Sequence, residues 1–438
     1  MTKALKGRKL LLVGFTLFSM FFGAGNLIFP PDLGAKAGVN FWPAFLGLAL
    51  SAVGLPVAGV IAVARADGLD KLAGRVHPVF AQVFMILIYL SIGPCLAIPR
   101  TASTSFAMLT PLLGSSAGLQ LGYSVLFFGA AFLVALRPDR LTRWLGRLLC
   151  PCLLVLILIL FGGCLLHPLA AQYGAPTDAY SSAVILQGVL YGYQTMDALA
   201  ALNFGAVIAM NIRAQGVARE QDVQRSAIRA GLVAGGLLLR QHGQHLGTGG
   251  KTGHGGTGQR SGVPQHGIDR QQQPARHKTV LAERLFGKAG LVQLAAIFML
   301  ACFNTCVGLI ACVGEYFHTL LPRIPYPALA AFFAAASMLI ANLGLAEILR
   351  LSVPVLNALY PVAIVLITLS FVPGLEQRRR VYPLCIGCTA VQSIAAALPL
   401  GALSALANAL PLAALGFGWV LPAAAGLLAG ILLSRTEK

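Results

Sequence analysis

Apolar runs of about 20 residues recur along the chain, and each is long enough to cross a bilayer as an α-helix. Only 11% of the 438 residues are charged, whereas soluble domains carry about 25%. Because backbone groups inside a bilayer must be hydrogen-bonded within the protein, such runs fold as helices. The sequence therefore predicts an all-α polytopic membrane protein that forms a single transmembrane domain over residues 1–438 and lies in a lipid bilayer.

Positive charges lie mainly in short loops between the apolar runs, so the net charge of +18 does not indicate a nucleic-acid partner. Arg-rich loops follow every second run, which the positive-inside rule explains if both termini are cytoplasmic. This alternation requires about twelve spans. They are expected at residues 10–29, 41–64, 79–98, 119–136, 148–166, 182–210, from 230 onward, 291–317, 328–343, 353–372, 382–398 and 415–433.

The seventh span is interrupted by residues 240–284, which are rich in Gly, Gln, His and Arg and have few aliphatic side chains. This composition is typical of a disordered linker. Its histidines allow one interpretation, a metal-binding segment. A second interpretation is a genuine extracellular insertion. The composition changes abruptly at both ends, which favours a third: a frameshift in the coding DNA that replaces part of helix seven and the following outer loop.

The first span is interrupted by helix-breaking residues, because positions 22–31 read FGAGNLIFPP. Glycine weakens a helix by roughly 1 kcal/mol and proline by about 3 kcal/mol. Irregular backbone at membrane depth is tolerated only where it lines a cavity or is buried in protein. In secondary transporters, such breaks bind the substrate and the coupling ions. Close helix packing would also explain the small residues, but we expect Gly23, Ala24, Gly25 and Asn26 to form part of a binding site.

The sixth span is interrupted in the same way between Gly188 and Asp197, where positions 191–197 read YGYQTMD. Asp197 is an acid inside an apolar segment, and intramembrane ionisable residues are costly and usually functional. It could bind Na⁺, accept a coupling proton or meet a substrate ammonium group. A buried structural acid is the alternative. The candidate residues of this break are Tyr193, Gln194, Thr195, Met196 and Asp197.

Three further motifs supply weaker signals. Asn304 and Thr305 in the eighth span offer oxygen ligands of the kind that a hard cation prefers. Arg100 follows Pro99, where we expect it to cap the end of the third span or to extend toward the membrane surface. Pro354 and Pro361 are expected to break the tenth span beside the site.

The chain contains no Walker loop, no nucleophile elbow and no H-E-x-x-H motif. We therefore expect that it is not an enzyme and that it needs no cofactor. The lack of a nucleotide-binding motif favours secondary transport over transport driven by ATP.

Together, these motifs resemble the bacterial branched-chain amino acid:cation symporter family, within the amino acid-polyamine-organocation superfamily. The resemblance rests on FFGAGNLIFPP (21–31), GPCLAIPRTA (93–102), GYQTMDALA (192–200), ACFNTCVGL (301–309) and ANLGLAEILRLSVPVLNALYP (341–361). It implies twelve spans in a five-plus-five inverted repeat with helices one and six broken. It also implies Na⁺-driven import of L-leucine, L-isoleucine and L-valine across the bacterial inner membrane. Residues 240–284 depart from the family pattern.

By this resemblance, Gly23 to Asn26 and Tyr193 to Asp197 hold the charged groups of the amino acid. Na⁺ is bound by backbone near Phe22 and Ala24, together with Asn304 and Thr305. Phe18, Phe22 and Met196 contact the aliphatic side chain. Two alternatives stay open: a proton-coupled permease for neutral amino acids, and a relative inactivated by the disrupted helix seven.

Overall fold

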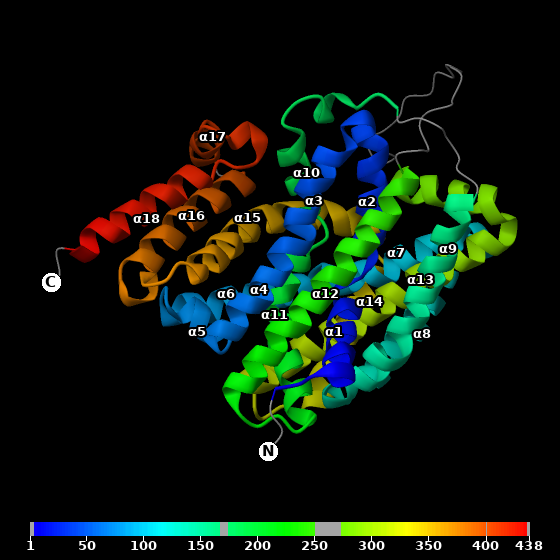
Figure 1. The fold of residues 1–438 in the computed structure, drawn as a ribbon, viewed down its shortest axis with the longest axis horizontal. Coiled ribbons are helices and arrows are strands. Elements are labelled where there is room, and N and C mark those ends of the chain that lie inside the picture. Colours follow the sequence, from blue (N-terminus) through cyan, green and yellow to red (C-terminus); the bar gives the residue numbers. More distant parts are fainter. Residues whose placement is uncertain (1–3, 167–173, 250–272, 400, 436–438) are drawn as a thin grey trace.

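The computed structural model describes residues 4–166, 174–249, 273–399 and 401–435, and every regular element among them is a helix. Figure 1 shows long helices crossing one another around a central group. The α-helices are α1 (Gly7–Phe21), α2 (Ala24–Ala37), α3 (Phe41–Ala49), α4 (Leu55–Ala66), α5 (Leu69–Gly74), α6 (Pro78–Leu90), α7 (Ala97–Leu113), α8 (Ala117–Ala135), α9 (Cys150–Leu166), α10 (Val184–Tyr193), α11 (Asp197–Ala214), α12 (Glu220–Gly249), α13 (Gln273–Leu320), α14 (Tyr326–Ala341), α15 (Leu345–Phe371), α16 (Val381–Ala397), α17 (Ala402–Asn408) and α18 (Val420–Arg435).

Each predicted span coincides with a helix or with a pair of consecutive helices. By length and hydropathy alone, however, six helical stretches of the described residues qualify as membrane spans, or seven if the bent pair α16 and α17 counts as one. This criterion misses helices that are short or broken, and it joins α2 to α4 across a turn at Gly38, whose φ is +51°. The all-helical class is confirmed, while the count of twelve is not confirmed by this measure.

Both predicted breaks are present. The first span consists of α1 and α2, which are separated at Phe22 and Gly23. The sixth span consists of α10 and α11, which are separated by residues 194–196. The glycines, asparagine and acid that predicted these breaks therefore lie where the helices stop and restart.

Three predicted boundaries or breaks are wrong. Pro30 and Pro31 do not end the first span, because α2 continues through both to Ala37. The third span does not end near Pro99, because α7 continues to Leu113 and the Ser and Thr side chains of its first turns bond to carbonyls of the same helix. Pro354 and Pro361 do not interrupt the tenth span, since both lie inside the continuous helix α15. Neighbouring helices and local adjustments commonly accommodate proline in membrane helices.

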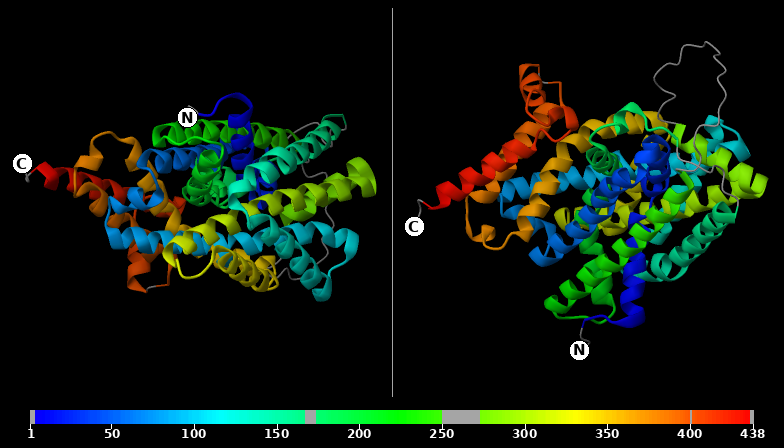
Figure 2. Two further views of the ribbon diagram at one scale, coloured as in Figure 1. Left: turned by 90° about the horizontal axis from the view of Figure 1, so that it is seen from below. Right: turned by 45° about the horizontal axis from the view of Figure 1, so that its top comes forward.

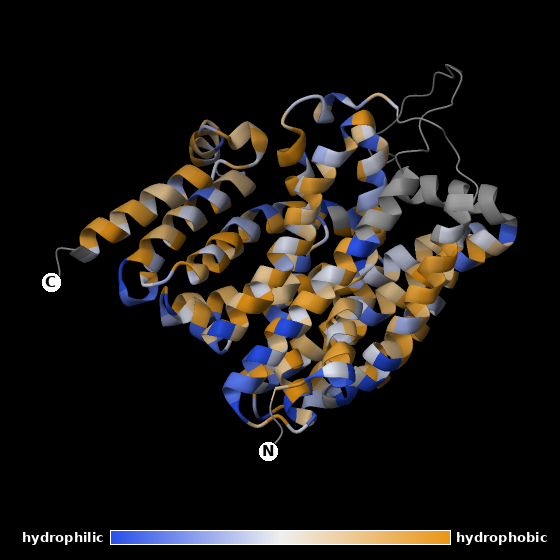
Figure 3. Cartoon of the chain, viewed as in Figure 1, coloured by the Kyte–Doolittle hydropathy of each residue, from blue (hydrophilic) through white to orange (hydrophobic). Residues whose placement is uncertain are grey.

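The outward surface of the helices is strongly apolar, as expected of a protein surrounded by lipid tails. Leu126 of α8 is 76% exposed and Val391 of α16 is 71% exposed, while Phe127 and Phe128 of α8 pack into the core. Figure 3 shows hydrophilic residues gathered at helix ends, notably near the N-terminus and around α5. Figure 2 shows α16 and α18 at one edge of the molecule, away from the centre where the two breaks lie.

The predicted anomalous stretch lies partly at the end of α12 and the start of α13, and its residues 250–272 lie outside the described residues. Before it, α12 is an ordinary core helix. A Cβ atom on Gly14 of α1 would lie 2.6 Å from Val233, and one on Gly235 would lie 2.4 Å from Val57 of α4. The first part of the seventh span is therefore closely packed against α1 and α4.

Candidate functional site

The break in the first span is a tight turn centred on Phe22. The amide of Gly23 donates to the carbonyl of Phe21 at 2.7 Å, and Phe22 has φ −74° and ψ 75°. These are the values of an inverse γ-turn. The helix restarts at Ala24, so the first amides of α2 point into the region of the break, where a helix N-terminus favours an anion.

The break in the sixth span follows Tyr193. The amides of Gln194, Thr195 and Met196 bond to carbonyls three residues earlier rather than four. Met196 then adopts φ +66°, in the left-handed region that non-glycine residues rarely occupy. Asp197 follows as the first residue of α11, where the helix dipole stabilises a negative charge.

The two breaks meet through Asn26 and Asp197. Nδ2 of Asn26 lies 2.6 Å from Oδ2 of Asp197 and 2.8 Å from the carbonyl of Phe21. Asn26 is 1% exposed and Asp197 is 4% exposed. A Cβ atom on Gly25 would lie only 2.9 Å from Cα of Thr195, so glycine is what allows the two breaks to approach. The structure thus joins the two segments that the sequence singled out separately.

The eighth span contributes Thr305 from α13. Its hydroxyl donates to the carbonyl of Met20 at 2.9 Å, at the end of α1, and a Cβ atom on Gly23 would lie 2.7 Å from that same hydroxyl. Asn304 is fully buried, and its side-chain amide has no partner among the described residues. Successive residues point about 100° apart around a helix, which is why only Thr305 reaches the break in the first span.

Arg100 is a site residue that the sequence analysis missed. It lies in the first turn of α7, is 6% exposed, and donates to the carbonyls of Gln194 at 2.9 Å and Thr195 at 3.3 Å. The expectation that it extends to the membrane surface is wrong, because α7 continues beyond it. The available signal was an arginine that directly follows an apolar run, since intramembrane ionisable residues are usually functional.

A cavity of about 30 Å³ lies where these elements converge. A water molecule needs roughly 10–15 Å³, so a small ion or one to two waters would fit. Drug-sized ligands occupy pockets of roughly 300–1,000 Å³. The cavity is lined by Met20, Phe21, Gly23, Ala24, Gly25, Asn26, Ile92, Ala97, Arg100, Thr101, Thr195, Met196, Asp197, Ala200, Thr305 and Leu309.

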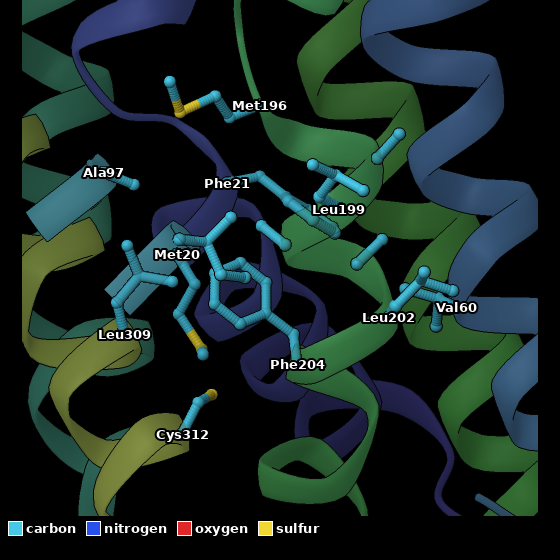
Figure 4. Packing of buried hydrophobic residues seen from close by; sticks show 14 of the residues in the cluster. Met20, Phe21, Val60, Ala97, Met196, Leu199, Leu202, Phe204, Leu309 and Cys312 are labelled. Carbon is cyan, nitrogen blue, oxygen red and sulfur yellow. The ribbon is translucent and has the colours of Figure 1, made fainter. Parts of the chain in front are cut away.

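A larger cavity of about 570 Å³ lies toward the end of the molecule that carries the N-terminus. Its lining includes Asp70 and Glu220, and the amide of Leu5 bonds to Ser226 at this end of α12. The two cavities are about one helical turn apart, since Leu309 lines one and Cys312 the other. Figure 4 shows Met20 and Phe204 between Met196 on one side and Cys312 on the other. An apolar plug therefore separates the small cavity from the large one.

The opposite end of the site is closed by contacts between α2 and α10. The Tyr191 hydroxyl donates to the Asp32 carboxylate, and Lys36 lies 2.6 Å from the same carboxylate. The rings of Phe29 and Tyr191 meet edge to face, with centroids 5.2 Å apart. A Cβ atom on Gly188 would lie 2.1 Å from the Ala44 carbonyl of α3. This end is therefore tightly packed, in contrast to the hollow at the N-terminal end.

The predicted site residues divide into two groups. Gly23, Ala24, Gly25, Asn26, Thr195, Met196, Asp197 and Thr305 line the small cavity. Phe22, Tyr193, Gln194 and Asn304 are not among its lining residues. Phe22 stacks on Phe18, with ring centroids 5.1 Å apart. Tyr193 and Gln194 instead face a separate cavity of about 320 Å³ beside α15 and α16.

Comparison with solved structures shows the fold. The chain superposes on the nucleobase-cation-symport-1 family transporter Mhp1 with a TM-score of 0.60 and 12% identity, over 97% of this chain and 92% of Mhp1. A Na⁺-coupled sialic acid symporter matches with a TM-score of 0.55 and 12% identity, over 98% of this chain and 90% of that one. The chain therefore shares the fold of these two transporters.

Comparison of sequences shows the family. The Bacillus subtilis branched-chain amino acid permease BraB is 37% identical, over 99% of this chain and 97% of its own. The Pseudomonas aeruginosa branched-chain amino acid transport system 2 carrier protein is 38% identical, over 98% of this chain and 97% of its own. Residues 6–437 match the family model described as branched-chain amino acid transport protein. This chain is therefore a member of the branched-chain amino acid transport protein family.

Proposed function

We propose that this protein is a secondary transporter that imports L-leucine, L-isoleucine and L-valine in symport with Na⁺ across the bacterial inner membrane. The observation that carries the proposal is the buried hydrogen bond between Asn26 and Asp197, which joins the two helix breaks beside a cavity. Discontinuous helices that meet near the bilayer midplane form the substrate and ion sites of secondary transporters. Family membership supplies the substrate class.

The charged groups of an amino acid find complementary partners in the lining of this cavity. The N-terminal amides of α2, near Gly23 to Asn26, suit the substrate carboxylate. The Asp197 carboxylate suits the ammonium group, and it is held in place by Asn26 and by the start of α11. Tyr193, Gln194, Thr195 and Met196 shape the backbone on that side.

The coupling ion fits the side of the break that faces α13. Thr305 brings a hydroxyl oxygen to the end of α1, and backbone carbonyls near Phe22 and Ala24 add further oxygens. Oxygen ligands of this kind suit a hard cation such as Na⁺. Asn304, which the sequence analysis also assigned to the ion site, does not line the small cavity, so this part of the proposal rests on Thr305 and the backbone carbonyls.

The aliphatic side chain of the substrate needs only an apolar surface. Met196 is buried beside the break, and Phe18 and Phe22 stack on the α1 side. One methylene changes binding in such a pocket by about 1–3 kcal/mol. Such a pocket therefore discriminates poorly among leucine, isoleucine and valine, and we expect all three to be transported.

The two sides of the site suggest how access alternates. Alternating access in this class of transporter comes from rocking or gating of one helix bundle against another around a fixed site. With both termini in the cytoplasm, the cavity of about 570 Å³ is the cytoplasmic vestibule. The contacts of Tyr191 with Asp32 then close the outer side. An amino acid enters the small cavity only when the surrounding helices separate.

A proton-coupled permease for neutral amino acids is the second candidate. The observation in its favour is that Asp197 is a buried carboxylate at the centre of the site, and buried acids form proton relays in transporters. Symport with protons would then replace symport with Na⁺, while the amino acid site stayed the same.

Uptake of radiolabelled leucine into proteoliposomes containing the full chain separates these candidates. We expect an inward Na⁺ gradient to drive accumulation, and isoleucine and valine to compete with leucine. A matched inward K⁺ gradient is the control. Accumulation driven by a proton gradient without Na⁺ would establish the second candidate. If no gradient drives leucine uptake, and a chimera that carries the α12 segment of the Bacillus subtilis relative is equally inactive, both proposals fail.

A further inference from the structure

Arg100 occupies an unusual position for a charged side chain. It lies within α7, at the level of both helix breaks, and it lines the same cavity as Asp197. An arginine inside a membrane protein is costly unless its charge and its donors are satisfied. Its guanidinium donates to the two consecutive carbonyls of Gln194 and Thr195, in the segment that joins α10 to α11.

These two carbonyls need a donor because α10 has stopped. Gln194 and Thr195 follow the last residue of α10, so their carbonyls have no partner within that helix and lie at its negative C-terminal end. A cation with a planar fork of donors satisfies both carbonyls at once. Arg100 therefore replaces, from another helix, the hydrogen bonds that are lost where the sixth span unwinds.

The residue that follows these carbonyls is under strain. Met196 has φ +66°, and non-glycine residues hold such conformations only where surrounding contacts enforce them. Its side chain is 2% exposed. Figure 4 shows Met196 above Phe21, with Ala97, one turn before Arg100 on α7, on the left. The bonds from Arg100 fix the backbone immediately before Met196, and so they fix where α11 and Asp197 begin.

The helix that carries Arg100 is itself well anchored. Ser103 donates to the Ala341 carbonyl of α14 at 2.9 Å, and the Tyr123 hydroxyl of α8 donates to Ser105 at 2.7 Å. The guanidinium thus links the break in the sixth span to a group of helices formed by α7, α8 and α14.

We propose that Arg100 is a positioning residue: it clamps the carbonyls of Gln194 and Thr195 to α7 and thereby holds Asp197 in its place for transport. The inference rests on the proposed transport function for its consequence, but the clamp itself can be measured without transport. Arg100 acts through the backbone of the break and does not need to contact the substrate.

The test of the clamp is hydrogen–deuterium exchange of the full chain in lipid nanodiscs. In Arg100→Met, we expect exchange of amides in residues 192–198 to accelerate by at least about tenfold, the factor for losing one charge-assisted hydrogen bond. Peptides from α15 and α16 should be unchanged. Ser103→Ala is the matched control, because it removes a buried hydrogen bond from the same helix without touching the break.

Arg100→Gln is the second variant, for use if Arg100→Met is not recovered in folded form. Its neutral side-chain amide can donate a good hydrogen bond to at most one of the two carbonyls. It must also accelerate exchange in residues 192–198. If exchange there stays within about twofold of the parent protein in the variants recovered, the clamp is disproved. This holds whether or not the parent protein transports leucine, so failure of the clamp is distinct from failure of the proposed function.

Transport kinetics test the positioning role. We expect Arg100→Met to lower Vmax for leucine uptake at least about tenfold, and Arg100→Lys to restore part of it, because lysine keeps the charge and can bond to one carbonyl. Ser103→Ala should keep Vmax near that of the parent. If exchange accelerates while Vmax and KM stay unchanged, or if lysine restores no more activity than methionine, the positioning role is overturned.

Discussion

Asn26 and Asp197 are 171 positions apart in the chain and joined by a buried hydrogen bond of 2.6 Å. Asn26 also bonds to the carbonyl of Phe21, the last residue of α1. One amide group therefore ties together the end of α1, the start of α2 and the start of α11. This relationship places an acid, a helix N-terminus and two irregular backbone segments around one point.

Replacing Asp197 with asparagine should abolish coupled uptake. The substitution preserves shape and can still bond to Asn26, but it removes the charge that we propose faces the ammonium group. Removing one partner of a buried charge pair costs about 3–5 kcal/mol, so leucine uptake should fall by more than about 100-fold. Uptake into proteoliposomes at equal reconstituted protein measures the effect. Asp178→Asn, at an exposed acid, is the control. Unchanged uptake in Asp197→Asn would remove this residue from the site.

How far the sequence could predict the site depends on what each residue type signals by itself. Closely spaced glycines weaken a helix, and asparagine and aspartate are costly inside an apolar run, so both breaks and Asp197 were predictable. The partner that each of these residues contacts was not predictable, because the contact between Gly25 and Thr195 depends on how helices that are distant in sequence pack together. The likeness of the two breaks indicated a common site but not its geometry.

Arg100 and Asn304 show where prediction failed for physical reasons. The Ser and Thr residues after Arg100 lower the hydropathy of α7, so the helix looked finished at Pro99; in the structure Ser103 and Ser105 bond back to carbonyls of their own helix. Asn304 and Thr305 are equally good oxygen donors in the sequence, yet only Thr305 lines the small cavity. The rotation of a helix about its axis decides which of two adjacent residues faces the cavity. The hydropathy pattern carries too little information to predict that rotation.

Replacing Gly25 with alanine should separate the two breaks. The added Cβ atom would lie 2.9 Å from Cα of Thr195, a backbone atom that cannot move without displacing the whole segment. Overpacking of this kind costs about 1–3 kcal/mol, so we expect leucine uptake to fall at least about fivefold. Gly122→Ala, in α8, is the matched control, because nothing lies within 4 Å of its added Cβ atom. Equal uptake in both variants would show that the close approach is not needed.

Replacing Tyr191 with phenylalanine should loosen the closed end of the site. The ring contact with Phe29 remains, but the hydrogen bond to Asp32 is lost. Hydrogen bonds to charged groups contribute about 1.5–3 kcal/mol, so the state open on this side should gain about tenfold in population. A larger binding-competent fraction raises apparent affinity. The KM for leucine applied from this side should therefore fall several-fold.

The control for Tyr191→Phe is Tyr382→Phe. Tyr382 lies in α16, outside the site, and its hydroxyl accepts a hydrogen bond of 3.1 Å from Arg75. It should leave KM unchanged. Uptake into right-side-out and inside-out vesicles tells the two sides apart. A fall in KM from both sides, or a rise in KM from the α2–α10 side, would contradict the assignment of Tyr191 and Asp32 as the contacts that close that side.

The pattern of burial along α12 makes the frameshift hypothesis testable. Its buried positions recur three or four residues apart, ending with Ala230, Ala234, Leu238 and Gln241. If this spacing of buried positions continues, the next buried positions are 245 and 248, where the sequence has His and Thr. A helix that continues in the same packing needs aliphatic residues there. We expect the coding DNA of residues 240–284, read in another frame, to supply about a dozen aliphatic residues and then a short polar loop. Resequencing checks this directly. If no frame supplies them, the stretch is genuine, and a chain carrying it should fail to transport leucine while a chimera with the α12 segment of the Bacillus subtilis relative transports it.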